Sequence, residues 1–233
     1  DTRVHIPLTK IRLNQFNRTS LDKYTTLVMV SGTYSQISEK EIKKIKDWVS
    51  KGNTLVTIGS ASSWAIKKEI VSESLVETKK DSVFSRKRYI DAREYIGREA
   101  IGGSILSVDL DLTHPLAFGY RDKSIPVYKN NNVFLRKSES QYSSVALYSE
   151  DPHIDGYISK NNMEKNIKGS ASLIVSSIGS GRAVLFADNP NFRGTWYGTN
   201  KLFLNAIFFG ANISVPKYHT GFVNLNEYRI STD

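Results

Sequence analysis

The chain has 233 residues, enough for one large domain or two small ones, and its content of 39% hydrophobic and 24% charged residues is that of a folded globular protein. It contains no cysteine, which excludes disulfides, thiolate metal sites and cysteine nucleophiles. The net charge of +9 raises the question of nucleic acid, but acidic residues are interspersed among the lysines, and no apolar run approaches the roughly 20 residues that span a bilayer, so we expect neither a nucleic acid partner nor a membrane span.

The first part of the sequence predicts strands and a helix in alternation. Alternating apolar and polar residues predict a half-buried strand over residues 4–13. Two apolar runs, residues 27–30 and 54–58, are typical of strands buried on both faces, as in parallel sheets. Between them, Ser38 followed by Glu41 is a capping-box pattern and predicts the start of an amphipathic helix. A strand, helix, strand order indicates parallel strands with right-handed crossovers.

The pattern changes after residue 70. We expect residues 71–165 to form an insertion or excursion, because residues 71–98 are charged and have no sustained period. Short strand-like pieces within residues 125–160 are expected to be antiparallel and peripheral. The core pattern returns in residues 171–176 and 182–187, two strands joined by a tight glycine turn and therefore a predicted hairpin.

Together these elements predict an α/β fold. We expect a three-layer, flavodoxin-like parallel sheet with an inserted, mostly antiparallel middle region. It would occupy residues 1–213, and residues 214–233, which have no period, would form a C-terminal tail.

A polar and aromatic loop follows the last predicted strand and is the main candidate site. Its candidate ligand-binding residues are Asp188, Asn189, Asn191, Arg193 and Trp196. Ligands of open α/β sheets bind at the carboxyl ends of strands, so these groups are placed to bind a carboxylate, a glycan or a peptide. A purely structural interpretation is equally open: Asp188 and Arg193 would pair, the amides would close the turn, and Trp196 would pack in the core.

The four histidines give no metal site. His5, His114, His153 and His219 are not spaced as metal ligands are, and we expect no metal or other cofactor in this segment. His114 stands in a turn before a proline and is added to the candidate ligand-binding residues. Its alternative role is that of a hydrogen-bonded turn residue.

A serine hydrolase is an alternative function. Ser60 and Ser62 follow a buried strand, where a strand-to-helix turn lifts the nucleophile of many hydrolases. Such a serine needs a positioned base, and His114 is the mid-chain histidine with a suitable loop setting. Against this, small residues at such a turn also permit close packing and cap the helix. We therefore expect no catalytic residue in this chain.

Five segments carry a resemblance to a known family: Tyr24–Gly32, Trp48–Gly52, Asp111–Gly119, Ile154–Ser159 and Asp188–Asn205. In this order, which covers most of the chain, they resemble the C-terminal region of bacterial zinc carboxypeptidase-like proteins. There, a class I glutamine-amidotransferase-like domain follows a catalytic domain of the carboxypeptidase A type. The resemblance implies an amidotransferase-like fold, the peptidase domain of the parent chain as partner, zinc in that domain only, and a secreted or periplasmic location.

The chain departs from these families where catalysis is concerned. The zinc motif His-x-x-Glu is absent, and the turn after residue 58 offers Ala61 where the amidotransferase cysteine is expected. An amidotransferase-like core would normally have a further strand and helix before Val4, so we expect either that the chain is a fragment or that another segment completes the sheet. The resemblance therefore predicts a non-catalytic accessory domain that supports the peptidase domain or contacts its substrate. A glycan- or peptide-binding module using the loop at 188–196 is the alternative.

Overall fold

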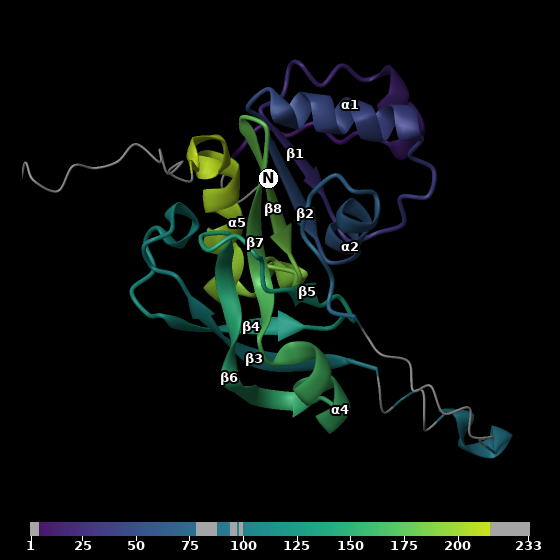
Figure 1. Ribbon diagram of the computed structural model, residues 1–233, viewed down its shortest axis with the longest axis vertical. Helices are drawn as coiled ribbons and strands as arrows, with labels where there is room; N and C mark the ends of the chain where they lie inside the picture. The colour runs from purple at the N-terminus through teal and green to yellow at the C-terminus, as the bar shows by residue number, and fades with distance from the viewer. Residues whose placement is uncertain (1–4, 78–87, 94–96, 98–99, 215–233) are drawn as a thin grey trace, which may run out of the picture.

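A single mixed β-sheet organises the chain (Figure 1). The computed structural model describes residues 5–77, 88–93, 97 and 100–214. Within these residues the sheet has eight strands in the order β1-β2-β8-β7-β6-β3-β4, with β5 paired to β7. The strands are β1 (Thr26–Met29), β2 (Thr54–Ile58), β3 (Gly103–Leu110), β4 (Ser124–Lys129), β5 (Leu135–Arg136), β6 (Ser144–Tyr157), β7 (Ser170–Ile178) and β8 (Gly181–Phe186).

The sheet divides into a parallel and an antiparallel part. Strands β1, β2 and β8 are parallel to one another. From β8 onward every neighbouring pair is antiparallel, beginning with the predicted hairpin of β7 and β8. The α/β fold with an antiparallel middle region is therefore confirmed, and its parallel strands are three.

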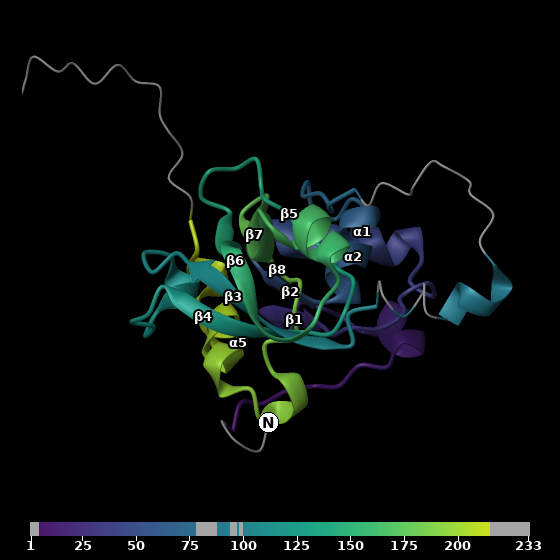
Figure 2. The same cartoon turned by 90° about the horizontal axis from the view of Figure 1, so that it is seen from below.

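Helices cover both faces of the sheet and make three layers (Figures 1 and 2). Helices α1 (Glu39–Ser50) and α2 (Ser60–Lys67) pack on one face, and α5 (Tyr197–Phe209) packs on the other. The shorter helical segments are η1 (Leu13–Arg18), η2 (Tyr89–Asp91), η3 (Pro115–Ala117), α4 (Lys160–Asn162), η4 (Met163–Ile167), η5 (Phe192–Gly194) and η6 (Gly210–Asn212). None of the helices in the described ranges has the length and apolarity needed to cross a membrane.

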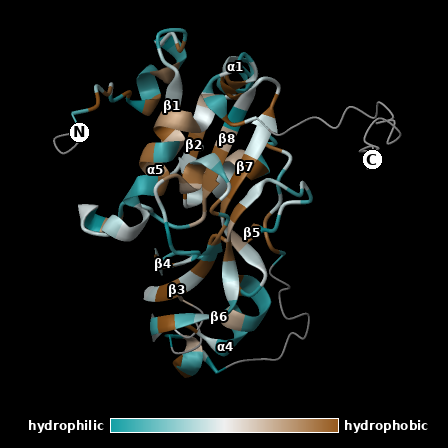
Figure 3. Ribbon diagram, turned by 90° about the vertical axis from the view of Figure 1, so that its left-hand side faces the viewer, coloured by the Kyte–Doolittle hydropathy of each residue, from teal (hydrophilic) through white to brown (hydrophobic). Residues whose placement is uncertain are grey.

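Each face of the central strands builds its own hydrophobic core. On β2, Leu55 faces the cluster beneath α1 and α2, while Val56 faces the cluster beneath α5. Strand β8 alternates in the same way, with Leu185 on the first side and Phe186 on the second. Figure 3 shows the hydrophobic colour along strands of the sheet, β7 and β8 among them. Because both faces of β2 and β8 are buried, the sequences of these strands are continuous apolar runs.

Helix α1 forms where the capping pattern predicts it. The backbone N–H of Ser38 donates to Glu41 Oε2 at 2.8 Å, and the hydroxyl oxygen of Ser38 accepts from the Glu41 N–H at 3.4 Å. Four apolar residues recur at helical spacing and are buried against the sheet: Ile42, Ile45, Trp48 and Val49. The capping box sets the start of the helix, and the apolar stripe is the face that packs on the sheet.

The expected strand over residues 4–13 is wrong for the part of it that the structure describes. Residues 5–12 have no regular structure, and the 3-10 helix η1 begins at Leu13. Pro7 has no N–H to give to a strand ladder, and the side chain of Leu8 is 58% exposed. Alternation alone was therefore a misleading signal here.

The middle region also differs in position from the expectation. Its strands pair antiparallel, but β6 is not peripheral, because it lies between β7 and β3 within the sheet. Val145, Ala146 and Tyr148 of this strand are buried. Parts of the expected excursion, residues 78–87, 94–96 and 98–99, lie outside the described residues, as does nearly all of the expected C-terminal tail.

Candidate functional site

The strand-to-helix turn between β2 and α2 is built around Gly59. Its backbone has φ 58° and ψ −121°, a conformation that side-chain-bearing residues rarely adopt. A Cβ atom at this position would lie 3.0 Å from the Oγ of Ser31, which follows β1. This strained turn is where hydrolases of related architecture place their nucleophile. The turn position therefore belongs to Gly59 rather than to Ala61, and it carries no side chain.

The two serines proposed as nucleophiles have structural roles. Ser60 Oγ accepts from the N–H of Gly32 at 2.8 Å and donates to the Gly32 carbonyl at 2.9 Å, which ties the ends of β1 and β2 together. Ser62 is fully buried, and its hydroxyl donates to the carbonyl of Phe186 at 2.8 Å. Among the described residues, no histidine bonds to either serine. Both hydroxyls are thus bonded to backbone groups of neighbouring segments.

His114 caps the short helix η3. Its Nδ1 accepts from the N–H of Leu116 at 3.1 Å. Burial lowers the pKa of His114, and the nearby charge of Asp111 opposes part of this effect. The imidazole is therefore neutral at pH 7 and serves as a hydrogen-bonded turn residue, the alternative role expected from the sequence.

Asp188 lies at the carboxyl end of β8 and forms a buried ion pair. Its Oδ1 is 3.1 Å from the Nζ of Lys129, and the two side chains are only 6% and 0% exposed. The partner of Asp188 is thus Lys129, and not Arg193 as the structural interpretation of the sequence supposed. Lys129 also donates to the carbonyl of Val133 at 2.8 Å.

Two hydroxyls complete the shell around Asp188. Tyr148 Oη and Ser172 Oγ donate to Asp188 Oδ2 at 2.6 and 2.7 Å. Burial raises the pKa of Tyr148 and the charge of Asp188 raises it further, so the phenol keeps its proton and remains a donor. Burial lowers the pKa of Lys129, an effect that Asp188 opposes. The ion pair and the two hydroxyl hydrogen bonds together offset the cost of removing these polar groups from water.

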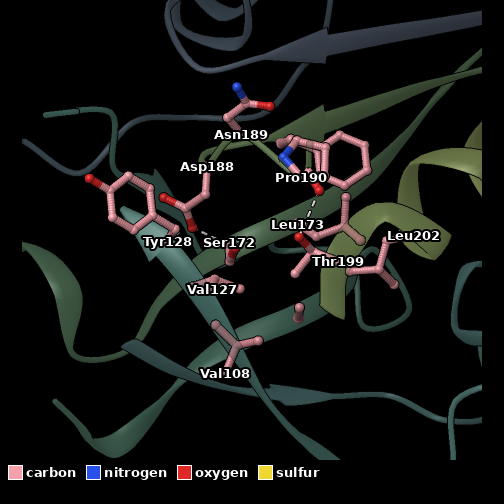
Figure 4. A pocket seen from close by; sticks show the side chains of 12 residues that line it. Val108, Val127, Tyr128, Ser172, Leu173, Asp188, Asn189, Pro190, Thr199 and Leu202 are labelled. Carbon is pink, nitrogen blue, oxygen red and sulfur yellow. Dashed lines mark hydrogen bonds between the residues drawn. The ribbon is translucent and has the colours of Figure 1, made fainter. Parts of the chain in front are cut away.

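A cavity of about 10 Å³ adjoins this cluster between the sheet and α5 (Figure 4). Asp188 and Ser172 line its polar side, and apolar residues such as Val127, Leu173 and Leu202 line the rest. This volume matches roughly one water-sized sphere and excludes a metabolite. The buried ion pair therefore has no room beside it for a substrate.

The loop after Asp188 is closed by its own amides. Asn189 Oδ1 accepts from the N–H of Asn191 at 3.0 Å, and Asn191 Oδ1 accepts from Nδ2 of Asn200 at 2.6 Å. Both candidate amides therefore stabilise the turn and the start of α5.

The rest of the loop forms an aromatic patch with β4, which we define as Tyr128 of β4 together with Phe192 and Trp196 of the loop. The rings of Tyr128 and Phe192 stack with centroids 3.9 Å apart, and Trp196 lies 6.0 Å from Tyr128. The indole N–H of Trp196 donates to the carbonyl of Pro126 at 3.3 Å. Arg193 is exposed, with its guanidinium 5.3 Å from the Phe192 ring centroid and its backbone at φ 51°.

The candidate residues thus fall into four places. Asp188 is buried with Lys129, and Asn189 and Asn191 close the turn before α5. Trp196 belongs to the aromatic patch with Arg193 beside it, and His114 caps η3. Sequence reasoning missed Lys129, although it continues the inward alternation of Ile125 and Val127 along β4. No three His, Asp or Glu side chains of the described ranges gather closely enough to hold a metal ion.

Comparison with known proteins identifies the fold. No protein-family model and no curated protein sequence matches the chain. Among solved structures, PurLQS from Thermotoga maritima is similar with a TM-score of 0.51 and 14% identity, over 80% of each chain. A candidate GMP synthase component from Thermoplasma acidophilum gives a TM-score of 0.49 at 13% identity, covering 82% of this chain and 75% of its own. A candidate ThuA-like protein from Parabacteroides merdae gives 0.49 at 14% identity, with coverages of 85% and 76%. The chain therefore has the three-layer α/β fold of class I glutamine amidotransferases.

Proposed function

We propose that this chain is a non-catalytic accessory domain of a larger enzyme. The observation that carries the proposal is Gly59, which occupies the strained turn of the fold without a side chain. The buried carboxylate of Asp188 is paired with Lys129 and has no substrate-sized cavity beside it. A domain with these residues at the carboxyl ends of β2 and β8 retains the scaffold of an enzyme but has neither a nucleophile nor a base at that place.

Activity measurements test the absence of catalysis. The purified chain is expected to release no ammonia from glutamine, to hydrolyse no p-nitrophenyl acetate above the Ser60→Ala variant, and to resist labelling by a fluorophosphonate probe. Turnover that Ser60→Ala or Ser62→Ala abolishes would refute the proposal and restore the serine hydrolase.

For the larger enzyme we propose a secreted, bacterial zinc carboxypeptidase-like protein, with its peptidase domain as the partner of this chain. The support is the resemblance of the five sequence segments from Tyr24–Gly32 to Asp188–Asn205. An antibody against the chain should detect, in the exported fraction of the source cells, a polypeptide heavier than 26.2 kDa. The precipitated protein should release C-terminal residues from a peptide in a reaction that 1,10-phenanthroline inhibits. A 26.2 kDa band confined to the cytosol contradicts this assignment.

A second candidate function is binding of a glycan or peptide at the aromatic patch. The observation that favours it is the combination of half-buried rings with the exposed guanidinium of Arg193, held at a positive φ. Aromatic faces stack on sugars and apolar side chains, and strained backbone is frequent at binding sites.

The structure decides which variants test this binding. Trp196 packs on Tyr128 and bonds to Pro126, so its replacement by alanine disturbs the fold as well as the patch. Arg193→Gly is cleaner, because glycine relieves the positive φ while the guanidinium is removed. The ligand is the soluble form of a glycan that the chain binds on a glycan array. We expect Arg193→Gly to weaken this binding, while the melting temperature of the variant is equal to or higher than that of the parent chain. Unchanged affinity would exclude this role for the loop.

A further inference from the structure

An open groove of about 500 Å³ lies at the end of the molecule remote from the Gly59 turn. It runs between the C-terminal ends of α2 and β7. The N-terminal end of α2 follows Gly59, and the N-terminal end of β7 carries Ser172, so the groove and the Gly59 turn lie at opposite ends of these elements. Its lining residues are Ile66, Glu69, Ile70, Val71, Ser72, Glu73, Ser177 and Ile178. The volume falls in the range of sites that bind small ligands or a few residues of a peptide.

The floor of the groove is apolar and firmly held. Ile70 and Val71 are 3% and 5% exposed and belong to the core beneath α1 and α2. Ile66 and Ile178 are half-buried and add apolar surface at the sides. The N–H of Ile70 donates to the carbonyl of Ala65 at 2.9 Å, which fixes the segment where it leaves α2. An aliphatic chain placed here would therefore bury apolar surface against a preformed floor.

The rim of the groove is acidic. Glu69 and Glu73 line it, and within the described residues neither carboxylate takes part in an ion pair. The nearest lysine in the sequence, Lys68, is held 2.7 Å from Glu39 of α1. In a chain of net charge +9, the lining of this groove thus contains two acidic side chains and no basic one.

We propose that this groove binds a short basic and apolar peptide segment of a partner protein. Aliphatic side chains, including the stem of a lysine, would lie on Ile66, Ile70 and Ile178, and the lysine ammonium would lie against Glu69 and Glu73. Charge complementarity selects this occupant: a neutral apolar peptide leaves both carboxylates unpaired, and an acidic peptide is repelled by them. The site is separate from the aromatic patch and does not depend on the proposed lack of catalysis.

The probe is a pair of blocked pentapeptides, Ala-Leu-Lys-Leu-Ala and Ala-Leu-Gln-Leu-Ala, titrated into the isotopically labelled chain and followed by backbone amide NMR shifts. We expect the lysine peptide to shift the amides of residues 66–73 and 177–178, and to bind about fivefold more tightly than the glutamine peptide. The preference should shrink as salt is raised, since the carboxylates are accessible to solvent.

Three variants separate the groove from the general charge of the surface. The double variant Glu69→Gln with Glu73→Gln should remove the preference for lysine, while Glu139→Gln, an exposed carboxylate away from the groove, should leave it unchanged. Ser72→Trp places a bulky ring at an exposed position of the lining and should weaken binding of both peptides without altering the melting temperature.

Several results would overturn the proposal. These are no binding of the lysine peptide at millimolar concentration, equal affinity for the two peptides, and shifts that map outside the groove. Self-association of the chain with shifts at the same residues would assign the groove to a second copy instead.

Discussion

At the scale of single residues, Gly59 is required both by its backbone and by its surroundings. Its φ is 58°, and a Cβ atom would lie 3.0 and 3.3 Å from the Oγ and Cβ of Ser31. We predict that Gly59→Ala lowers the free energy of unfolding by about 1–3 kcal/mol, because the left-handed backbone and the contact both penalise a side chain. Urea denaturation measures the change. Gly198→Ala, with no atom within 4 Å of its Cβ and a helical position, should be neutral or stabilising.

His114 gives the protein a predictable response to mild acid. Burial lowers the pKa of His114 in the folded chain, so the unfolded chain binds more protons as the pH falls. The stability that comes from the neutral imidazole is complete above the unfolded pKa of about 6.5 and is lost below it. We therefore predict that the free energy of unfolding decreases from pH 7 to pH 5.

The matched variant for this prediction is His114→Asn. An asparagine side-chain oxygen keeps an acceptor for the N–H of Leu116 but does not titrate. The variant should lose less stability than the parent chain between pH 7 and pH 5. Equal pH dependence of the two proteins would show that other groups cause the loss.

At the scale of elements, α1 is held by its own sequence. The capping box of Ser38 and Glu41 satisfies backbone donors that the first turn leaves free, and the hydrogen bonds from Ser38 lower the pKa of Glu41. We predict that Ser38→Ala lowers the free energy of unfolding by about 1 kcal/mol, whereas Ser38→Asp lowers it less, because aspartate also caps. Thermal denaturation followed by circular dichroism compares the two. A larger loss for Ser38→Asp would contradict the capping explanation.

Elements with local signals could be predicted from the sequence. Helix α1, strand β2 and the hairpin of β7 and β8 each combine an apolar pattern with a cap or a glycine turn. The segment at residues 5–12 could not, because an alternating pattern does not say whether a neighbouring strand will accept it. The interior position of β6 was also hidden, since the order of strands depends on contacts between residues far apart in the chain.

The candidate site was predicted unevenly for a similar reason. Asn189 and Asn191 were predicted as candidate ligand-binding residues, with turn closure as the alternative, and their hydrogen bonds are those of the alternative. The partner of Asp188 was not found, because Lys129 is 59 residues away and reaches it only through the antiparallel part of the sheet. A lysine on the buried side of an alternating strand is the signal that could have indicated it, since such a charge needs a buried partner.

At the scale of the whole molecule, the ion pair connects the two parts of the sheet. Lys129 ends β4, at the outer edge of the antiparallel part, and Asp188 follows β8, the last parallel strand. Tyr148 from β6 and Ser172 from β7 bond to the same carboxylate. Four segments of the sheet thus meet at one buried charge, which disfavours any register that would leave it unpaired.

This arrangement predicts strong coupling between the two charged residues. Lys129→Met leaves the carboxylate of Asp188 buried without its cation and should lower the free energy of unfolding by about 3–5 kcal/mol. Adding Asp188→Asn removes the uncompensated charge, while the amide oxygen still accepts from Tyr148 and Ser172. The double variant should therefore be more stable than Lys129→Met alone. Urea denaturation of the parent, both single variants and the double variant measures the coupling energy. Additive losses would mean that the two halves of the sheet are joined by their apolar core alone.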